Sequence, residues 1–173
     1  MAAIVLLTNK KNSRLEKILQ AALEKNCEYT GVIGALLRLG GRNRVLSVDK
    51  PFKRKISASL TVFDPGFRGE GFTISGTGIF PSCCCDAIKT AERSECRSIT
   101  CGTSSLDTLS IASCSENGVM VSLQREIQTL RGEIIEPCEI CIKTDEQPHI
   151  YPTLAAAACL LMLDVPYDKG YVL

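Results

Sequence analysis

Apolar residues recur along the first part of the chain in a pattern that predicts a strand followed by a helix. The apolar run at residues 3–7 is typical of a short buried strand. Five apolar residues at helical spacing then follow, namely Leu15, Ile18, Leu19, Ala22 and Leu23. Asn12 or Ser13 can cap this helix, because a short polar side chain there accepts a bond from a free backbone N–H. The opening is typical of α/β proteins.

Short apolar runs separated by polar turns continue the chain. Residues 31–39 are apolar and fit either a helix or a strand, and the glycines at 40–41 end the run. Residues 45–48 and 59–63 predict short strands on either side of a basic turn. The middle of the chain therefore favours extended structure.

A glycine-rich stretch follows. Five glycines between residues 64 and 78 predict a loop, within which 72–75 is extended, and 79–80 closes a short strand. Ser82 is the predicted cap of a helix over 83–93. Residues 98–101 then predict another buried strand, which stops at a glycine.

Beyond residue 102 the period changes to two. Residues 108–114 and 119–124 flank Asn117-Gly118, which is a strong signal for a β-hairpin. Residues 133–142 form a third extended run. An alanine-rich segment at 152–163, which begins with a proline and ends before Pro166, predicts a final helix.

Together these elements predict an α/β fold, with a Rossmann-like core and an added antiparallel hairpin or meander. A length of 173 residues and a hydrophobic content of 45% suit a single domain over 1–173. The longest apolar run, at 154–163, is too short to span a membrane. The first positive charges follow the first apolar run, which is the reverse of a signal peptide, so we expect a cytoplasmic protein without a membrane anchor.

The net charge of +1 conceals a strong polarity along the chain. Residues 1–55 hold twelve Lys and Arg against four acidic residues, whereas residues 56–173 hold eight against fifteen. The two halves can neutralise each other within one fold or between subunits. Neutralisation between subunits would favour a homo-oligomer. The alternative is an anion-binding face built from the basic first third. Nucleic acid is not the expected partner, because the basic segment offers only Phe52 for stacking.

Ten cysteines in a chain without an export signal are interpreted as reduced thiols. Cys83, Cys84 and Cys85 are consecutive and cannot converge on one metal ion, and the Cys138 and Cys141 side chains fall on opposite faces of a predicted strand. We therefore predict no metal site. We interpret the three consecutive cysteines as packing residues of the fold. The alternative is a reactive thiol at Cys83 or Cys84, because a helix N-terminus lowers the pKa of a thiol.

The segment from 79 to 166 resembles the late part of the central domain of the Mur ligases, ATP-dependent amide-forming enzymes. The resemblance rests on a strand that ends in a glycine at 98–102, an antiparallel meander, and a turn with His149 leading into an alanine-rich helix that ends in Val165-Pro166. The asparagines that flank the histidine in that family are replaced here, by Ile150 and Thr153. A second partial echo of the family, at 45–51, lies in a different register.

No segment fits the phosphate-binding pattern Gly-x-x-x-x-Gly-Lys-Ser/Thr. The resemblance therefore implies a relative in fold and not an active ligase. His149 is the single histidine and is interpreted as an ordinary loop residue, and no nucleophile elbow is present. We predict no catalytic residues and no cofactor.

The loop after the predicted strand at 98–101 is the leading candidate for ligand binding. In open α/β sheets, ligands bind beyond the carboxyl ends of the strands. Backbone amides and hydroxyls there, with a basic side chain, suit an anionic small molecule. The candidate residues are Arg97, Gly102, Thr103, Ser104 and Ser105. The sequence thus favours a non-catalytic, Mur-ligase-like binding or assembly protein, and the alternative is a small enzyme or ligand-sensing domain that uses this loop.

Overall fold

The computed structural model describes most of the chain. The described residues are 4–8, 13–26, 38–39, 42–43, 54–68, 71–115, 118–144 and 147–173. The sequence predictions for residues 31–37 and 45–48 lie outside them.

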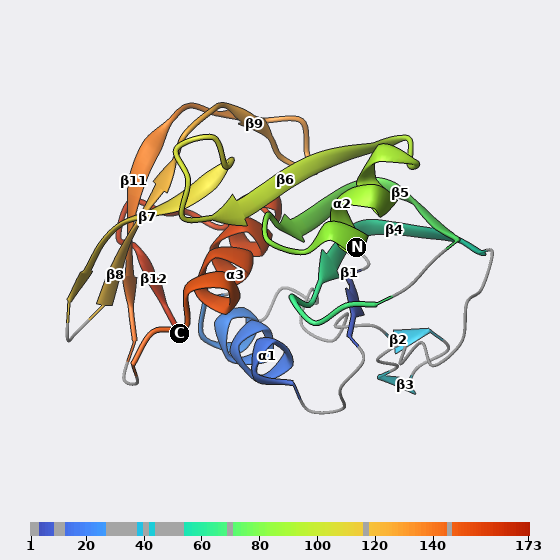
Figure 1. The fold of residues 1–173 in the computed structure, drawn as a ribbon. Helices are drawn as coiled ribbons and strands as arrows, with labels where there is room; N and C mark the ends of the chain where they lie inside the picture. Colours follow the sequence, from blue (N-terminus) through green and yellow to red (C-terminus); the bar gives the residue numbers. More distant parts are fainter. Residues whose placement is uncertain are drawn as a thin grey trace.

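An eight-stranded mixed sheet forms the centre of the molecule (Figure 1). In spatial order its strands are β1 (Ile4–Leu7), β4 (Arg54–Phe63), β5 (Phe72–Pro81), β6 (Cys96–Gly102), β7 (Leu109–Ser115), β8 (Gly118–Leu123), β11 (Cys138–Lys143) and β12 (Tyr171–Val172). Every pairing in this sheet is parallel except the two made by β8, which is antiparallel to both β7 and β11. Two short antiparallel pairs lie outside it, β2 (Arg38–Leu39) with β3 (Arg42–Asn43) and β9 (Ile127–Gln128) with β10 (Ile134–Ile135).

Three helices cover the two faces of the sheet. Helices α1 (Arg14–Asn26) and α3 (Ile150–Met162) share the larger hydrophobic cluster with one face, and α2 (Cys85–Glu92) shares a smaller cluster with the other. In Figure 1 the sheet curves around α3, and α1 packs against α3 and β12. The architecture confirms the predicted α/β fold with an added hairpin.

Helices α1 and α3 form for different reasons. The Ser13 hydroxyl accepts a hydrogen bond from the Glu16 amide at 3.2 Å, which confirms the predicted cap of α1, and the predicted apolar stripe of α1 is turned inward. Helix α3 contains no charged residue, and of its thirteen residues only Ile150 and Pro152 are not buried. Small alanine side chains let this helix approach both the sheet and α1. Helix α3 is thus the centre of the core.

Two sequence predictions in the middle of the chain are wrong. The glycine-rich stretch is not a loop up to residue 78, because β5 runs continuously from Phe72 to Pro81. Position 78 within this strand requires glycine, because a Cβ there would collide with the Phe80 ring. Ser82 does not cap α2, whose N-cap is Cys84 without a side-chain hydrogen bond. Ser82 is instead bonded to the loop that follows β6.

In the second half of the chain, the observed elements agree more closely with those predicted from the sequence. The predicted hairpin is confirmed as β7 and β8, and the predicted last helix as α3. The extended run at 133–142 is divided, because its first part pairs in β10 and its last part in β11. In the described part of the chain, no helix is long and apolar enough to cross a membrane.

Candidate functional site

The loop after β6, which the sequence favours for anion binding, is folded around a carboxylate of the protein itself. The Asp107 side chain is buried, and its Oδ2 accepts hydrogen bonds from the Ser104 amide at 3.1 Å and the Ser82 hydroxyl at 3.3 Å. A Cβ at Gly102 would lie 2.4 Å from the same oxygen. The donors nearest the strand end are therefore turned toward a negative charge, and Thr103 and Ser105 are exposed beside it.

Arg97 is not brought to this loop. It lies near the start of β6 and Gly102 lies at its end, a separation of about 16 Å along an extended strand. Arg97 Nη1 donates to the Gln128 side-chain oxygen at 3.1 Å and to the Gln128 carbonyl at 3.4 Å. The five candidate residues therefore do not form one site.

The two candidate thiols have different environments. Cys83 is exposed, whereas Cys84 is buried and its Sγ lies 3.5 Å from the Phe67 carbonyl oxygen, to which it donates. Among the described residues, no group of three or more His, Cys, Asp and Glu side chains is arranged to hold a metal ion. Cys138 is half-buried and Cys141 is exposed, in agreement with their placement on opposite faces of β11.

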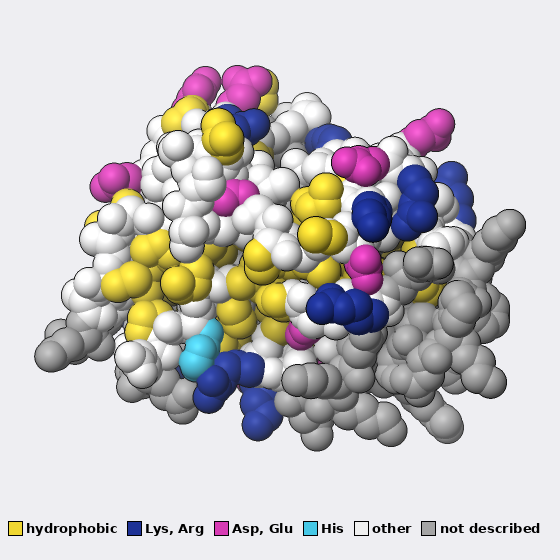
Figure 2. Space-filling view, viewed as in Figure 1, with side chains coloured by type: hydrophobic (Ala, Val, Ile, Leu, Met, Phe, Trp, Pro, Cys, Tyr) yellow, Lys and Arg dark blue, Asp and Glu magenta, His cyan; other side chains and the backbone are white. Residues whose placement is uncertain are grey.

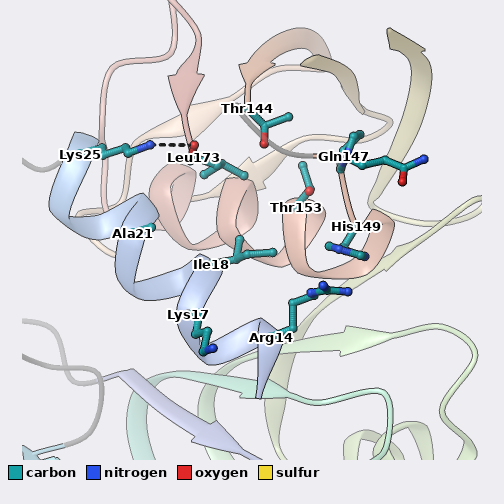
Figure 3. A pocket seen from close by; sticks show the side chains of 11 residues that line it. Arg14, Lys17, Ile18, Ala21, Lys25, Thr144, Gln147, His149, Thr153 and Leu173 are labelled. Carbon is teal, nitrogen blue, oxygen red and sulfur yellow. Dashed lines mark hydrogen bonds between the residues drawn. The ribbon is translucent and has the colours of Figure 1, made fainter. Parts of the chain in front are cut away.

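Basic side chains gather instead around a cavity of about 460 Å³ between α1 and the start of α3, which we call the basic pocket. Its charged and polar lining consists of Arg14, Lys17, Lys25, Thr144, Gln147, His149 and Thr153. Figure 3 shows these side chains arranged around the cavity, and Figure 2 shows the single histidine beside Lys and Arg side chains on the surface. Among the described residues that line the pocket, none is acidic.

Helix α1 supplies three cations from one stripe. Arg14, Lys17, Ala21 and Lys25 follow one another at intervals of three, four and four residues, which places them on the same side of a helix. Lys25 Nζ donates to the Leu173 carbonyl oxygen at 2.9 Å. Arg14 and Lys17 are exposed and make no hydrogen bond or ion pair with other described residues.

The positions of Arg14 and Lys17 are unfavourable for the helix alone. Both lie in the first turn of α1, where the helix dipole disfavours cations by about 0.3–1 kcal/mol each. Like charges three residues apart repel each other by a further few tenths of a kcal/mol, roughly. Glu16, in the same turn, offsets part of this cost, and a bound anion would offset more of it.

Helix α3 faces the stripe with its positive end. His149 is its N-cap and has no side-chain capping bond, and the helix continues for thirteen residues. Thr153 lies one turn further and is only 2% exposed, yet its side chain lines the cavity. No hydrogen bond within the described part of the chain uses the Thr153 hydroxyl. In Figure 3 this side chain lies between those of Thr144 and His149. Because Thr153 lines the cavity, its hydroxyl is open to hydrogen bonding with a group placed there.

Sequence reasoning missed this site although half of its signal was present. The excess of positive charge in residues 1–55 pointed to an anion-binding face, and the spacing of three and eight residues between Arg14, Lys17 and Lys25 places these basic residues on one side of a helix. The other half comes from the start of α3, more than 120 residues later. Only the packing of α1 against α3 brings the two together.

Comparison with known proteins adds no identification, because no protein-family model, curated protein or solved structure matches the chain. The resemblance to the Mur ligases and the assembly role that it implies stay predictions.

Proposed function

We propose that this protein is a non-catalytic ligand-binding domain that holds a small polyanionic molecule in the basic pocket. The observation that carries the proposal is the convergence of Arg14, Lys17, Lys25 and the start of α3 on a cavity whose described lining has no acidic residue. The Thr153 side chain adds a hydroxyl to the cavity wall. In the described part of the chain, no hydrogen bond joins the Thr153 hydroxyl to the His149 ring, so the pair lacks the contact of an activated nucleophile and we propose binding rather than catalysis.

The lining also restricts the ligand. Three cations suit two or more negative charges, as in a phosphorylated or polycarboxylate molecule. The apolar part of the lining consists of Ile18, Ala21, Pro148 and Leu173, and no Phe, Tyr or Trp is among the described lining residues. A nucleobase would have no such ring to stack on, so we propose a compact aliphatic polyanion.

We also propose a cytoplasmic location and a homo-oligomeric state. A cytoplasmic location is supported by the nine described cysteines, all of which are free thiols, since such thiols persist in a reducing compartment. A homo-oligomer remains the expectation from the charge polarity of the chain.

Thermal unfolding in the presence of pyrophosphate or citrate tests the proposal. A ligand that binds only the folded state at 100 times its Kd adds about 2.7 kcal/mol, which corresponds to a rise in Tm of about 5–10 °C for a chain of this size. We expect Arg14→Gln and Lys17→Gln each to weaken binding by about 10–100-fold, because each removes a charge-assisted hydrogen bond. Thr153→Val removes the inner hydroxyl and is expected to weaken binding with little change in charge.

Lys89→Gln is the matched control, because Lys89 is an exposed lysine on α2, which covers the other face of the sheet. Its Tm shift with pyrophosphate should equal that of the unmodified protein. Equal shifts in all four variants would show that the polyanion acts elsewhere, and no shift with either probe would remove the proposal.

A further inference from the structure

A second, smaller cavity of about 240 Å³ lies at the opposite end of α3, and we call it the Thr77 pocket. Its lining includes Thr77, Arg97, Arg125, Glu126, Gln128 and Met162. Thr77 and Arg97 face each other on the neighbouring strands β5 and β6, and Met162 is the last residue of α3. This pocket is therefore separate from the basic pocket, which contains the start of α3.

The Thr77 side chain is the first feature of this cavity that suits a ligand. Thr77 is only 1% exposed, and its Oγ1 has no hydrogen-bond partner in the described part of the chain. Buried hydroxyls in native proteins are nearly always bonded. Because Thr77 lines the cavity, a group placed there can supply the missing bond.

Two guanidinium groups with unused hydrogen-bond donors are the second feature of the cavity that suits a ligand. Arg97 is held by two bonds from Nη1 to Gln128, and Arg125 is held by a bond from Nη2 to the Leu106 carbonyl at 2.7 Å. Each guanidinium has five N–H groups, so both retain donors. Glu126 also lines the cavity, yet neither arginine forms an ion pair with it or with another described carboxylate. The arginines are thus oriented by neutral partners and available to an anion.

We propose that the Thr77 pocket binds a small aliphatic monocarboxylate, with its carboxylate on Arg97 and Arg125 and one of its oxygens accepting a bond from the Thr77 hydroxyl. Two arginines and one glutamate give the lining a net charge of +1, which matches a single negative charge. The carboxyl end of α3 contributes negative potential, which disfavours an anion of higher charge. Ile99, Ile127 and Met162 provide an apolar wall for a short alkyl chain.

The size of the cavity agrees with this class. It lies below the range of about 300–1,000 Å³ that is typical of sites for drug-sized ligands. Arg and carboxylate also match in geometry, because the planar guanidinium donates two parallel bonds to the two oxygens. The proposal gives Arg97 a role in ligand binding, although not at the loop after β6.

Titration of the ¹⁵N-labelled protein with sodium butyrate, followed by NMR, tests the proposal at the level of single residues. We expect saturable shifts of the Thr77, Arg97 and Gln128 amides, and smaller or no shifts there with inorganic phosphate at equal ionic strength. Thr77→Val keeps the shape of the side chain and removes its hydroxyl, so binding should weaken at least tenfold. Arg97→Gln should weaken it to a similar degree or more, and this exposed substitution leaves the core intact.

Arg93→Gln serves as the control for loss of an arginine, because Arg93 is exposed at the end of α2 on the other face of the sheet. Its butyrate affinity should be unchanged. The proposal is overturned if these amides show no saturable response, if Thr77→Val and Arg97→Gln bind butyrate as tightly as Arg93→Gln, or if phosphate shifts them more strongly than butyrate. The last outcome would identify an inorganic anion site.

Discussion

Tyr151 shows how a single buried side chain connects the core to the sheet edge. Its hydroxyl donates to the carbonyl oxygens of Phe63 and Ile79, at the carboxyl ends of β4 and β5. Burial raises the pKa of Tyr151 well above its usual value of 10.0, and burial likewise raises the pKa of Cys101 well above 9.0. In the folded protein, both groups therefore stay protonated at pH values where they ionise in the unfolded chain.

We predict that stability falls as the pH rises above about 9, first through Cys101 and then through Tyr151. The unfolded state binds fewer protons than the folded state in this range, so the free energy of unfolding decreases by up to about 1.4 kcal/mol per pH unit for each group. Well below pH 8 both groups are protonated in the folded and unfolded states, so neither contributes a slope. Urea unfolding at a series of pH values from 8 to 11 measures this.

The variant Tyr151→Phe separates the two groups. It should lose about 1–2 kcal/mol at pH 8, because two buried carbonyls lose a donor. Above pH 10 its stability should fall less steeply than that of the unmodified protein. An identical slope in both proteins would contradict the role of Tyr151.

At the scale of elements, β5 depends on a glycine that the chain cannot replace. Gly76 has a φ of +90°, and a Cβ there would lie 2.1 Å from the Ala58 carbonyl oxygen on β4. The register between β4 and β5 shifts between Ser57 and Leu60, so the two strands are irregular where Gly76 sits. The glycine permits both the turn of the backbone and the close approach.

Gly76→Ala should therefore destabilise the protein by about 2 kcal/mol more than Gly132→Ala, because it adds a backbone collision to the strained φ. Gly132 is the matched control, since its φ is +96° but nothing lies within 4 Å of a Cβ built there. Chemical denaturation of the two variants gives the difference. Equal losses would mean that β4 moves away at no cost.

The elements differ in how well the sequence predicted them. Helix α1 and the β7–β8 hairpin were predictable because their signals are local, a capped apolar stripe in one and an Asn-Gly turn in the other. The strand β5 was not predictable, because its glycines are required by tertiary contacts. Gly76 lies against the Ala58 carbonyl on the neighbouring strand, and Gly78 lies against the Phe80 ring. The basic stripe of α1 was visible in the spacing of Arg14, Lys17 and Lys25, but the opposing wall of the pocket depends on tertiary packing.

For the whole molecule, the distribution of thiols predicts a labelling pattern. Four described cysteines are exposed, and these are Cys83, Cys85, Cys114 and Cys141. Cys84, Cys101 and Cys159 are buried in the two hydrophobic clusters and react only after local opening. We expect iodoacetamide, read out by tandem mass spectrometry, to modify Cys83 at least about tenfold faster than Cys84.

This experiment also addresses whether Cys83 is a specialised thiol. An exposed thiol without special chemistry should react at the rate of Cys114 and Cys141, whereas an activated one should react much faster. Labelling of Cys84 as fast as Cys83 would contradict the packing described for the smaller cluster.

The central position of α3 has a consequence for how the protein is made. The strands from β1 to β8 turn one face toward a helix that occurs only at Ile150–Met162 in the chain. At synthesis rates of about 5–20 residues per second, roughly 5–20 s separate the completion of β4 from that of α3 on a ribosome. During this interval the nascent sheet has no α3 to cover its apolar face. Chaperones that hold newly made chains should therefore influence the yield of this protein more strongly than its final stability suggests.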